Sequence, residues 1–352
     1  MKWPTTSNSP AGRCAATSAG GPCSGGRTTA AAPEAPAPYR APWWLPGGHL
    51  QTIWPWLIGA PSIPLRRERW ERDDGDFTDL DWLDGPTQAP VVVLFHGLEG
   101  GSRSHYARAL MRALRHIGWR GVVAHFRACS GEPNRLPRAY HAGDSTEIGE
   151  ILAHLRPRAG RAPLYAVGVS LGGNALLKWL GEAGEAAQAV VARAAAVCAP
   201  LDLSAAGYAL DRGLNRLYTL HFLASLKPKL RHKRRTLAPR LDHIDLSGIW
   251  SMRAFDDRVT APLHGYRDAL DYWRRASARP WLAHIAVPTL VLNARNDPFL
   301  PASALPSATE AAASVRLEYP PEGGHVGFLT GPFPGRIDWL PRRLLRYLAT
   351  GD

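Results

Sequence analysis

The sequence predicts a doubly wound α/β fold, with a mostly parallel sheet, helices on both of its faces, and a helical segment inserted late in the sheet. Two observations lead to this fold class. Short apolar runs alternate with helical patterns from residue 90 onward, and the alternation stops between residues 203 and 280 before strand signals return. An alternating order of strands and helices is typical of parallel sheets joined by right-handed crossovers.

The predicted strands are short and apolar on both faces, as strands are when helices cover both sides of a parallel sheet. They span residues 91–95, 121–126, 164–169, 192–198, 289–293 and 315–319. Helical periodicity predicts helices over residues 106–116, 145–155, 171–181 and 337–348. Ahead of the first strand, residues 66–72 and 76–82 flank Asp74-Gly75 and predict an antiparallel hairpin.

The chain divides into a tail, a core in two parts, and a cap. Residues 1–38 are predicted to be a disordered low-complexity tail, because Ala, Gly, Pro, Ser and Thr fill 29 of these 38 positions without apolar periodicity. Residues 39–202 and 281–352 are predicted to form the α/β core. Residues 203–280 are predicted to be a helical cap, because such sheets bind ligands beyond the carboxyl ends of their strands.

Composition favours a globular protein without a membrane-spanning helix. The chain has 352 residues, of which 45% are hydrophobic and 20% charged. Residues 41–65 contain no charged side chain, but five prolines and three glycines interrupt any helix long enough to cross a bilayer. The tail lacks the continuous apolar stretch of a signal peptide. Because Cys129 and Cys198 lie in or beside apolar runs, reduced thiols and a cytoplasmic location are predicted.

The net charge of +12 suggests attraction to polyanions or anionic membranes without identifying a site. Arginines are spread along the whole chain with no zinc-finger or RNA-recognition signature, so no nucleic-acid partner is predicted. The run from Lys227 to Arg235, KPKLRHKRR, holds six Lys or Arg residues in nine. Such a run is either a solvated face or a peripheral contact with an anionic membrane. The sequence leaves both interpretations open, and it does not predict an oligomeric state.

A serine directly follows one of the predicted strands. Residues 164–174 have the sequence LYAVGVSLGGN, which places Ser170 between a strand and a helix. Gly168 and Gly172 lack the Cβ atoms that would clash in a tight strand-to-helix turn, and Gly173 allows close helix–strand packing. This context predicts a nucleophile elbow that exposes Ser170 above the sheet.

Candidates for an acid and a base follow the last two predicted strands. Asp297 lies just past strand 289–293, and His325 lies in the loop after strand 315–319. The adjacent pair Asp256-Asp257 is a rival for the acid, although it ends no strand. The chain order Ser, Asp, His matches α/β-hydrolases and differs from the orders of chymotrypsin-like and subtilisin-like proteases.

A candidate oxyanion hole ends the first core strand, in the sequence Phe95-His96-Gly97-Leu98. There the N–H of Leu98 can face the serine beside the N–H of Leu171, and each such donor typically contributes about 3 kcal/mol to the transition state. Gly97 lets an acyl group approach the backbone closely. His96 is a candidate for a supporting role rather than the base.

No cofactor and no metal are predicted. The chain has no G-x-G-x-x-G and no Walker A sequence, and HExxH is absent. His105, His125 and His141 do not have metal-ligand spacing to one another.

Over roughly residues 40–350, the sequence resembles the YheT-like branch of the α/β-hydrolase superfamily. The matching stretches are HLQT at 49–52, HGLEG at 96–100, HFRACSGEPN at 125–134, GVSLGGN at 168–174, FDDRVTAPLHGY at 255–266, NDPF at 296–299 and GGHVGF at 323–328. The resemblance implies the α/β-hydrolase fold and a triad of Ser170, Asp297 and His325. Relatives in this branch are described as esterases, lipases and acyl-ester-forming enzymes, which implies a medium- or long-chain, lipid-like carboxylic ester as substrate. The tail 1–38 and the run KPKLRHKRR fall outside the resemblance.

The motif HFRACSGEPN adds Arg127 and Glu132 to the candidate residues around the site. These side chains either form a polar network that ties their loop to the cap or take part in catalysis directly, and the network is the favoured interpretation. Asp257 is expected to act on the site only through the cap.

The sequence therefore predicts a serine hydrolase that cleaves carboxylic esters through an acyl-serine intermediate. An acyltransferase with an alcohol in place of water uses the same triad and is one alternative. A hydrolase-fold binding protein without turnover is the other.

Overall fold

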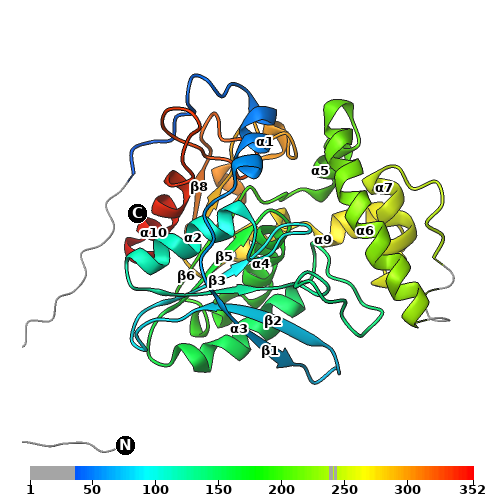
Figure 1. Cartoon of the computed structure of the whole chain (residues 1–352), viewed down its shortest axis with the longest axis horizontal. Coiled ribbons are helices and arrows are strands. Elements are labelled where there is room, and N and C mark those ends of the chain that lie inside the picture. Colours follow the sequence, from blue (N-terminus) through cyan, green and yellow to red (C-terminus); the bar gives the residue numbers. More distant parts are fainter. Residues whose placement is uncertain (1–35, 238–240, 242–243) are drawn as a thin grey trace, which may run out of the picture. The chain divides into compact units, whose positions relative to one another are not determined.

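The computed structural model describes residues 36–237, 241 and 244–352 (Figure 1). Most of the predicted tail therefore lies outside the described residues. Within its last three residues, the carbonyl of Ala37 accepts a 2.7 Å hydrogen bond from the Trp339 indole. Next to it, the Tyr39 hydroxyl donates to the carbonyl of Leu329 at 2.9 Å. The described chain thus begins in contact with the segment near its carboxyl end.

The strands in the described residues form one mixed sheet in the order β1-β2-β4-β3-β5-β6-β7-β8. They are β1 (Arg66–Glu71), β2 (Phe77–Leu83), β3 (Val91–Phe95), β4 (Arg120–Ala124), β5 (Leu164–Val169), β6 (Arg193–Val197), β7 (Thr289–Leu292) and β8 (Val315–Glu318). The β1–β2 and β2–β4 pairs are antiparallel, and every pair from β4 to β8 is parallel. The predicted doubly wound, mostly parallel sheet is confirmed.

Helices connect and cover these strands. They are α1 (Gly48–Ile58), α2 (His105–His116), α3 (Ser145–Ala159), α4 (Leu171–Ala183), α5 (Leu203–Leu210), α6 (Arg216–Leu237), α7 (Met252–Phe255), α8 (Ala261–Leu263), α9 (Ala269–Ala276) and α10 (Trp339–Thr350). Across the described residues, no helix has both the length and the apolar character needed to cross a membrane.

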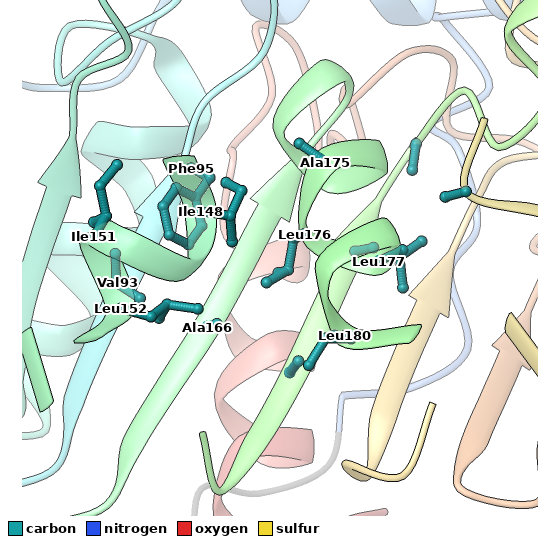
Figure 2. Close-up of a cluster of buried hydrophobic side chains, with 14 of the residues drawn as sticks. Val93, Phe95, Ile148, Ile151, Leu152, Ala166, Ala175, Leu176, Leu177 and Leu180 are labelled. Atoms are coloured by element: carbon teal, nitrogen blue, oxygen red, sulfur yellow. The ribbon is translucent and has the colours of Figure 1, made fainter. Parts of the chain in front are cut away.

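The two faces of the sheet are buried under different helices, because successive side chains of a strand point to opposite faces. Val91, Val93 and Phe95 of β3 pack with apolar side chains of α3 and α4. Figure 2 shows this cluster, with Ile148, Ile151 and Leu152 of α3 beside Leu176 and Leu180 of α4. The alternate residues of β3 pack in a second cluster with α2 and α10. The sheet is therefore rigidly held from both sides.

Residues 203–280, here called the helical insertion, lie between β6 and β7 and contain α5 to α9. The insertion has a small apolar core of its own, which includes Leu223, Leu230, Ile249 and Phe255. It is fastened to the sheet by Asn174 of α4, whose buried amide donates to the carbonyl of Ala276 at 2.8 Å and accepts from the N–H of Ala278 at 2.9 Å. Asn174 ends the sequence GVSLGGN, residues 168–174. This one short stretch therefore contains Ser170 and also anchors the end of the insertion.

The proline-rich segment 41–65 contains a helix that the sequence did not lead us to expect. Helix α1 runs from Gly48 to Ile58 with Pro55 in its interior. Because Pro55 has no N–H, the helix forms without the hydrogen bond to the carbonyl of Gln51.

Candidate active site

Ser170 lies at a sharp strand-to-helix turn, directly after β5 and directly before α4. Its backbone has φ 52° and ψ −121°, a strained combination for a residue with a side chain. A Cβ on Gly168 would lie 2.6 Å from the carbonyl oxygen of Gly172, and a Cβ on Gly172 would lie 2.5 Å from the carbonyl oxygen of His96. The glycines are therefore required by backbone approach, as a nucleophile elbow demands.

The structure brings the three candidate triad residues together. His325 Nε2 lies 2.9 Å from Ser170 Oγ, and His325 Nδ1 lies 2.8 Å from Asp297 Oδ2. The Asp297 side chain is 1% exposed and the His325 side chain 12%. The other Asp297 oxygen accepts the N–H of Phe299 at 2.8 Å, so the carboxylate is fixed on both sides. A histidine that lies within hydrogen-bond distance of both a serine hydroxyl and a buried carboxylate has the geometry that activates a serine nucleophile.

The loop that carries His325 is braced by α1, a contact that the sequence did not predict. The Thr52 hydroxyl accepts the backbone N–H of His325 at 2.8 Å. The Gln51 side-chain carbonyl accepts from Gly323 N at 2.8 Å and from the Asn296 amide at 2.9 Å. Gln51 and Thr52 belong to the stretch HLQT, and Asn296 to NDPF. Their place in stretches shared with the resembled family was the one sequence feature that could have pointed to them.

The rival acids lie elsewhere, in the helical insertion. Asp257 accepts the N–H of Ala269 at 2.7 Å. Asp256 is buried and accepts hydrogen bonds from Thr260 and Trp273, at 2.6 and 2.8 Å. Burial raises the pKa of Asp256 to about 7, and nearby Asp211 and Asp257 act in the same direction. Neither carboxylate has a hydrogen bond with His325 among the contacts of the described residues.

The turn that holds Leu98 lies against the serine. A Cβ on Gly97 would lie 3.1 Å from the Ser170 Cβ, and Leu98 and Leu171 line the same cavity as Ser170. His96 supports this turn: its Nδ1 lies 2.8 Å from the Gly97 carbonyl, and its Nε2 accepts the N–H of Phe126 at 3.1 Å. Burial lowers the pKa of His96 to about 3, so the ring is neutral, with its proton assigned to Nδ1 by these partners.

Backbone strain is concentrated around the site. Among the residues that the structure describes, six other than glycine have positive φ: Glu99, Ala128, Ser170, Cys198, Val326 and Phe328. Four of them line the cavity that contains the serine: Glu99, Ala128, Ser170 and Val326. Strained conformations of this kind persist only where the surrounding structure imposes them, and they cluster at functional sites.

Arg127 is fully buried and forms ion pairs on three sides. Its guanidinium binds Asp74 at 2.8 Å, Asp76 at 2.5 Å and Glu147 of α3 at 3.0 Å. These partners belong to the turn between β1 and β2 and to α3, so Arg127 ties its loop to the core. The favoured expectation was that it would tie the loop to the cap. Glu132, from the same motif, is exposed and pairs with Arg69 at 2.7 Å.

A second polar group joins the insertion to the turn beside the oxyanion candidates. Tyr140 accepts the backbone N–H of Glu99 at 2.8 Å and donates to the Glu99 carboxylate at 2.9 Å. Lys229 of α6 pairs with the same carboxylate at 2.8 Å. Glu99 directly follows Leu98, so this ion pair connects the helical insertion to the residue next to the candidate oxyanion donor.

The side chains of the basic run on α6, residues 227–235, do not all point the same way. Lys227 donates to the carbonyl of Ile249, Lys229 pairs with Glu99, and the buried Lys233 donates to the carbonyls of residues 136–138. Arg231 and Arg235 are exposed. The lysines therefore point toward the protein, and only part of the run is available to a partner.

A cavity of about 1490 Å³ opens over Ser170 and His325, between the sheet and the helical insertion. The insertion contributes Leu203, Leu210, Phe222, Leu226, Met252 and Phe255 to its lining. This volume exceeds the usual range for a small-ligand pocket, roughly 300–1,000 Å³, and its walls are largely apolar.

Within the described residues, one group of side chains could hold a metal ion: Cys198, Asp297 and His325, whose ligand atoms lie within 4.8 Å of one another. Both His325 nitrogens already face other partners, Asp297 and Ser170. The Cys198 thiol accepts the N–H of Val326 at 3.3 Å. The arrangement thus supports the histidine loop with contacts that need no ion.

Comparison with known proteins relates this chain to several hydrolases. The family described as alpha/beta hydrolase fold matches residues 90–332. "Putative esterase YheT" of Escherichia coli (strain K12) is 40% identical over 86% of this chain and 90% of its own length. Phospholipase ABHD3 of Mus musculus is 30% identical over 82% of this chain and 72% of its own length.

Solved structures share the fold. The esterase EaEST from Exiguobacterium antarcticum superposes with a TM-score of 0.52 at 18% identity, covering 80% of this chain and 99% of that one. The Pyrococcus furiosus esterase Pf2001 superposes with a TM-score of 0.51 at 13% identity, covering 83% of this chain and 96% of that one. At these identities the likeness concerns the fold alone.

Proposed function

Because the chain belongs to the α/β-hydrolase fold family, we propose that it is a serine hydrolase that cleaves carboxylic esters through an acyl-serine on Ser170. One observation carries the proposal. His325 is within hydrogen-bond distance of both Ser170 Oγ and the buried Asp297 carboxylate, at 2.9 and 2.8 Å. The names of the relatives, an esterase and a phospholipase, agree with this class of reaction.

The mechanism begins when His325 Nε2 takes the proton of Ser170 Oγ as the oxygen attacks the ester carbonyl carbon. Asp297 holds the ring through Nδ1 and stabilises the imidazolium that forms. The N–H groups of Leu98 and Leu171 are the proposed donors to the oxyanion, since both residues border the cavity at the serine. The protonated ring then gives its proton to the departing alcohol oxygen as the C–O bond breaks. A water molecule then gives a proton to His325 and attacks the acyl carbon. The ring returns the proton to Ser170 Oγ as the acyl–serine bond breaks, which releases the carboxylic acid.

The proposed substrate class follows from the cavity. A volume of about 1490 Å³ with apolar walls accommodates a medium- or long-chain acyl group. We assign the acyl chain to the side built by the helical insertion, which acts as a cap over the triad. The free thiols Cys129 and Cys198 agree with a reducing compartment, and a cytoplasmic location is part of the proposal.

Labelling with a fluorophosphonate probe followed by peptide mapping tests the mechanism. We expect one labelled residue, Ser170, and a fall in kcat of about 10⁶-fold in Ser170→Ala. Ser102→Ala is the matched control, because Ser102 also lines the cavity. We expect this variant still to be labelled at Ser170. Circular dichroism verifies that each variant is folded.

A wild-type protein that neither takes the label nor cleaves p-nitrophenyl esters of any chain length contradicts the proposal and favours a binding protein. Product analysis in water with added ethanol separates hydrolysis from acyl transfer. Free acid is expected to dominate, whereas ethyl ester in excess at low ethanol would identify a transferase.

A further inference from the structure

Exposed apolar side chains gather on two helices next to the cavity. Thirteen large hydrophobic residues are exposed in the described part of the chain. Five of them lie on α1: Leu50, Ile53, Trp56, Leu57 and Ile58. Three more lie at the start of α6 or just before it: Leu214, Leu217 and Leu220. Single exposed apolar residues are ordinary, but a concentration on two neighbouring helices indicates an interaction surface.

The two helices contact each other, so their exposed side chains form one surface. The His49 ring of α1 stacks on Tyr218 of α6 with centroids 5.9 Å apart, and the Trp56 ring meets His221 at 5.7 Å. Leu50, Ile53 and Leu57 recur at helical spacing along α1. We call the eight exposed apolar residues the apolar rim: Leu50, Ile53, Trp56, Leu57 and Ile58 of α1, with Leu214, Leu217 and Leu220.

The apolar rim is continuous with the mouth of the cavity. Ile53, Trp56 and Leu57 of α1 and Leu217 of α6 line the cavity that holds Ser170. A ligand bound at the apolar rim would therefore reach Ser170 without crossing bulk water.

The two segments that carry the apolar rim contain no acidic side chain. Residues 41–65 contain no charged side chain, and residues 212–241 contain no Asp or Glu. Arg212, Arg216, Arg231 and Arg235 are exposed along or just before α6. Exposed arginines therefore lie at both ends of α6, with the exposed leucines of the apolar rim beside the first two. Apolar side chains beside Lys or Arg on a helix lying parallel to a surface are the pattern of peripheral binding to anionic lipid.

From the apolar rim, its continuity with the cavity and this charge pattern, we propose that the mouth of the cavity docks on an anionic lipid surface. Leu50, Leu57 and Leu220 enter the headgroup layer, and Arg231 and Arg235 lie against the anionic headgroups. The docking surface is then α1 with the outer face of α6, and the lysines of the basic run take no part. The proposal concerns binding and does not depend on turnover by Ser170.

Sedimentation with vesicles tests the docking surface. The catalytically silenced Ser170→Ala chain is used as the parent, so that lipid cleavage cannot alter the vesicles and a failed hydrolase proposal leaves this test intact. Vesicles of phosphatidylcholine with about a quarter phosphatidylglycerol are compared with pure phosphatidylcholine at low and high salt. We expect the anionic vesicles to bind the protein more tightly, and salt to weaken that binding.

Two sets of variants locate the surface. Leu50→Ser with Leu220→Ser, which are 50% and 41% exposed and do not line the cavity, is expected to weaken binding about tenfold. Leu270→Ser with Trp250→Ser, at 40% and 64% exposure, is the matched control away from the apolar rim and is expected to leave binding unchanged. Arg231→Gln with Arg235→Gln is expected to reduce the preference for anionic vesicles, while the exposed Arg212 and Arg216 retain part of it.

Equal losses in the two apolar pairs, or binding that ignores lipid charge, would overturn the proposal. So would an absence of vesicle binding. If the parent instead forms a dimer in sedimentation equilibrium that Leu50→Ser with Leu220→Ser dissociates, the apolar rim belongs to a second copy of the chain and the lipid proposal is wrong.

Discussion

The carboxyl edge of the sheet and the helical insertion face the same cavity but are held together in different ways. Ser170 follows β5 directly, and its backbone N–H donates to the carbonyl of Val197 in β6 at 2.8 Å. Strands and glycines with no room for a Cβ fix the geometry on that side. The insertion contains very short helices, such as α7 and α8, and contacts the site through long side chains such as Lys229.

The difference teaches which part of the site each region controls. Reacting atoms need placement to a fraction of an ångström, which a packed sheet supplies. The volume and polarity of the cavity depend on side chains of the insertion, which can change without moving the serine. We therefore expect substitutions at the sheet edge to affect kcat and substitutions in the insertion to affect KM, stability or chain-length preference.

The largest expected effect comes from exchanging the acid at the sheet edge. Asp297→Asn keeps the shape of the side chain but removes the charge that stabilises the imidazolium, so kcat should fall about 10⁴-fold. Asp257→Asn in the insertion is the matched control, with an expected change of less than about threefold, since Asp257 bonds to Ala269 and not to His325. Steady-state kinetics on a p-nitrophenyl ester measures both. Equal losses in the two variants would place the acid on the insertion.

A pH-dependent effect on stability should come from the insertion. Burial raises the pKa of Asp256 to about 7 from its ordinary value of 3.8. The folded state therefore holds a proton that the unfolded state has lost, and this contribution to stability is full below the ordinary pKa and disappears as pH rises through about 7. Relative to Asp256→Asn, the wild type should lose about 2 kcal/mol of unfolding free energy between about pH 5 and pH 7.

Urea unfolding at several pH values measures this difference. The asparagine can still accept from the Trp273 indole and donate to Thr260, the partners of Asp256. Unfolding free energies that run parallel in the two proteins would mean that Asp256 is ionised in the folded state.

The smallest expected effect tests the contact between the two regions. Lys229→Gln removes the ion pair with Glu99, which is partly exposed and worth about 1 kcal/mol. We expect kcat/KM to fall about fivefold, and the loss to shrink at high salt because salt screens the wild-type pair. Lys227→Gln, two residues away on α6 and bonded within the insertion to Ile249, is the control. A loss of the same size in both variants would make the effect one of helix stability.

The strands, the sharp turn at Ser170 and the chain order of Ser170, Asp297 and His325 could be predicted because each depends on short-range sequence. Ser170, Asp297 and His325 all follow apolar runs of strand length, and parallel strands end at one edge. The structure brings these three side chains into one chain of hydrogen bonds. Such an arrangement is largely a consequence of strand order.

The supporting contacts could not be predicted, because they depend on which distant segments meet. Prolines argued against a helix in residues 41–65, yet α1 forms there and braces the histidine loop through Gln51 and Thr52. The run from Lys227 to Arg235 looked uniformly basic in the sequence. Only the placement of α6 separates lysines that face the protein from arginines that face outward.

The brace between α1 and the histidine loop has a consequence for how the protein is made. Thr52 Oγ1 and the His325 N–H are separated by 273 residues along the chain, and Gln51 and Gly323 by 272. During translation Ser170 emerges long before the loop that carries His325, and contacts this distant in sequence form late in folding. Until residue 325 has been made, a nascent chain therefore lacks the ring that contacts Ser170 Oγ. Under the proposed mechanism such a chain has no general base for Ser170, so the order of the sequence delays ester cleavage until the histidine loop has been made.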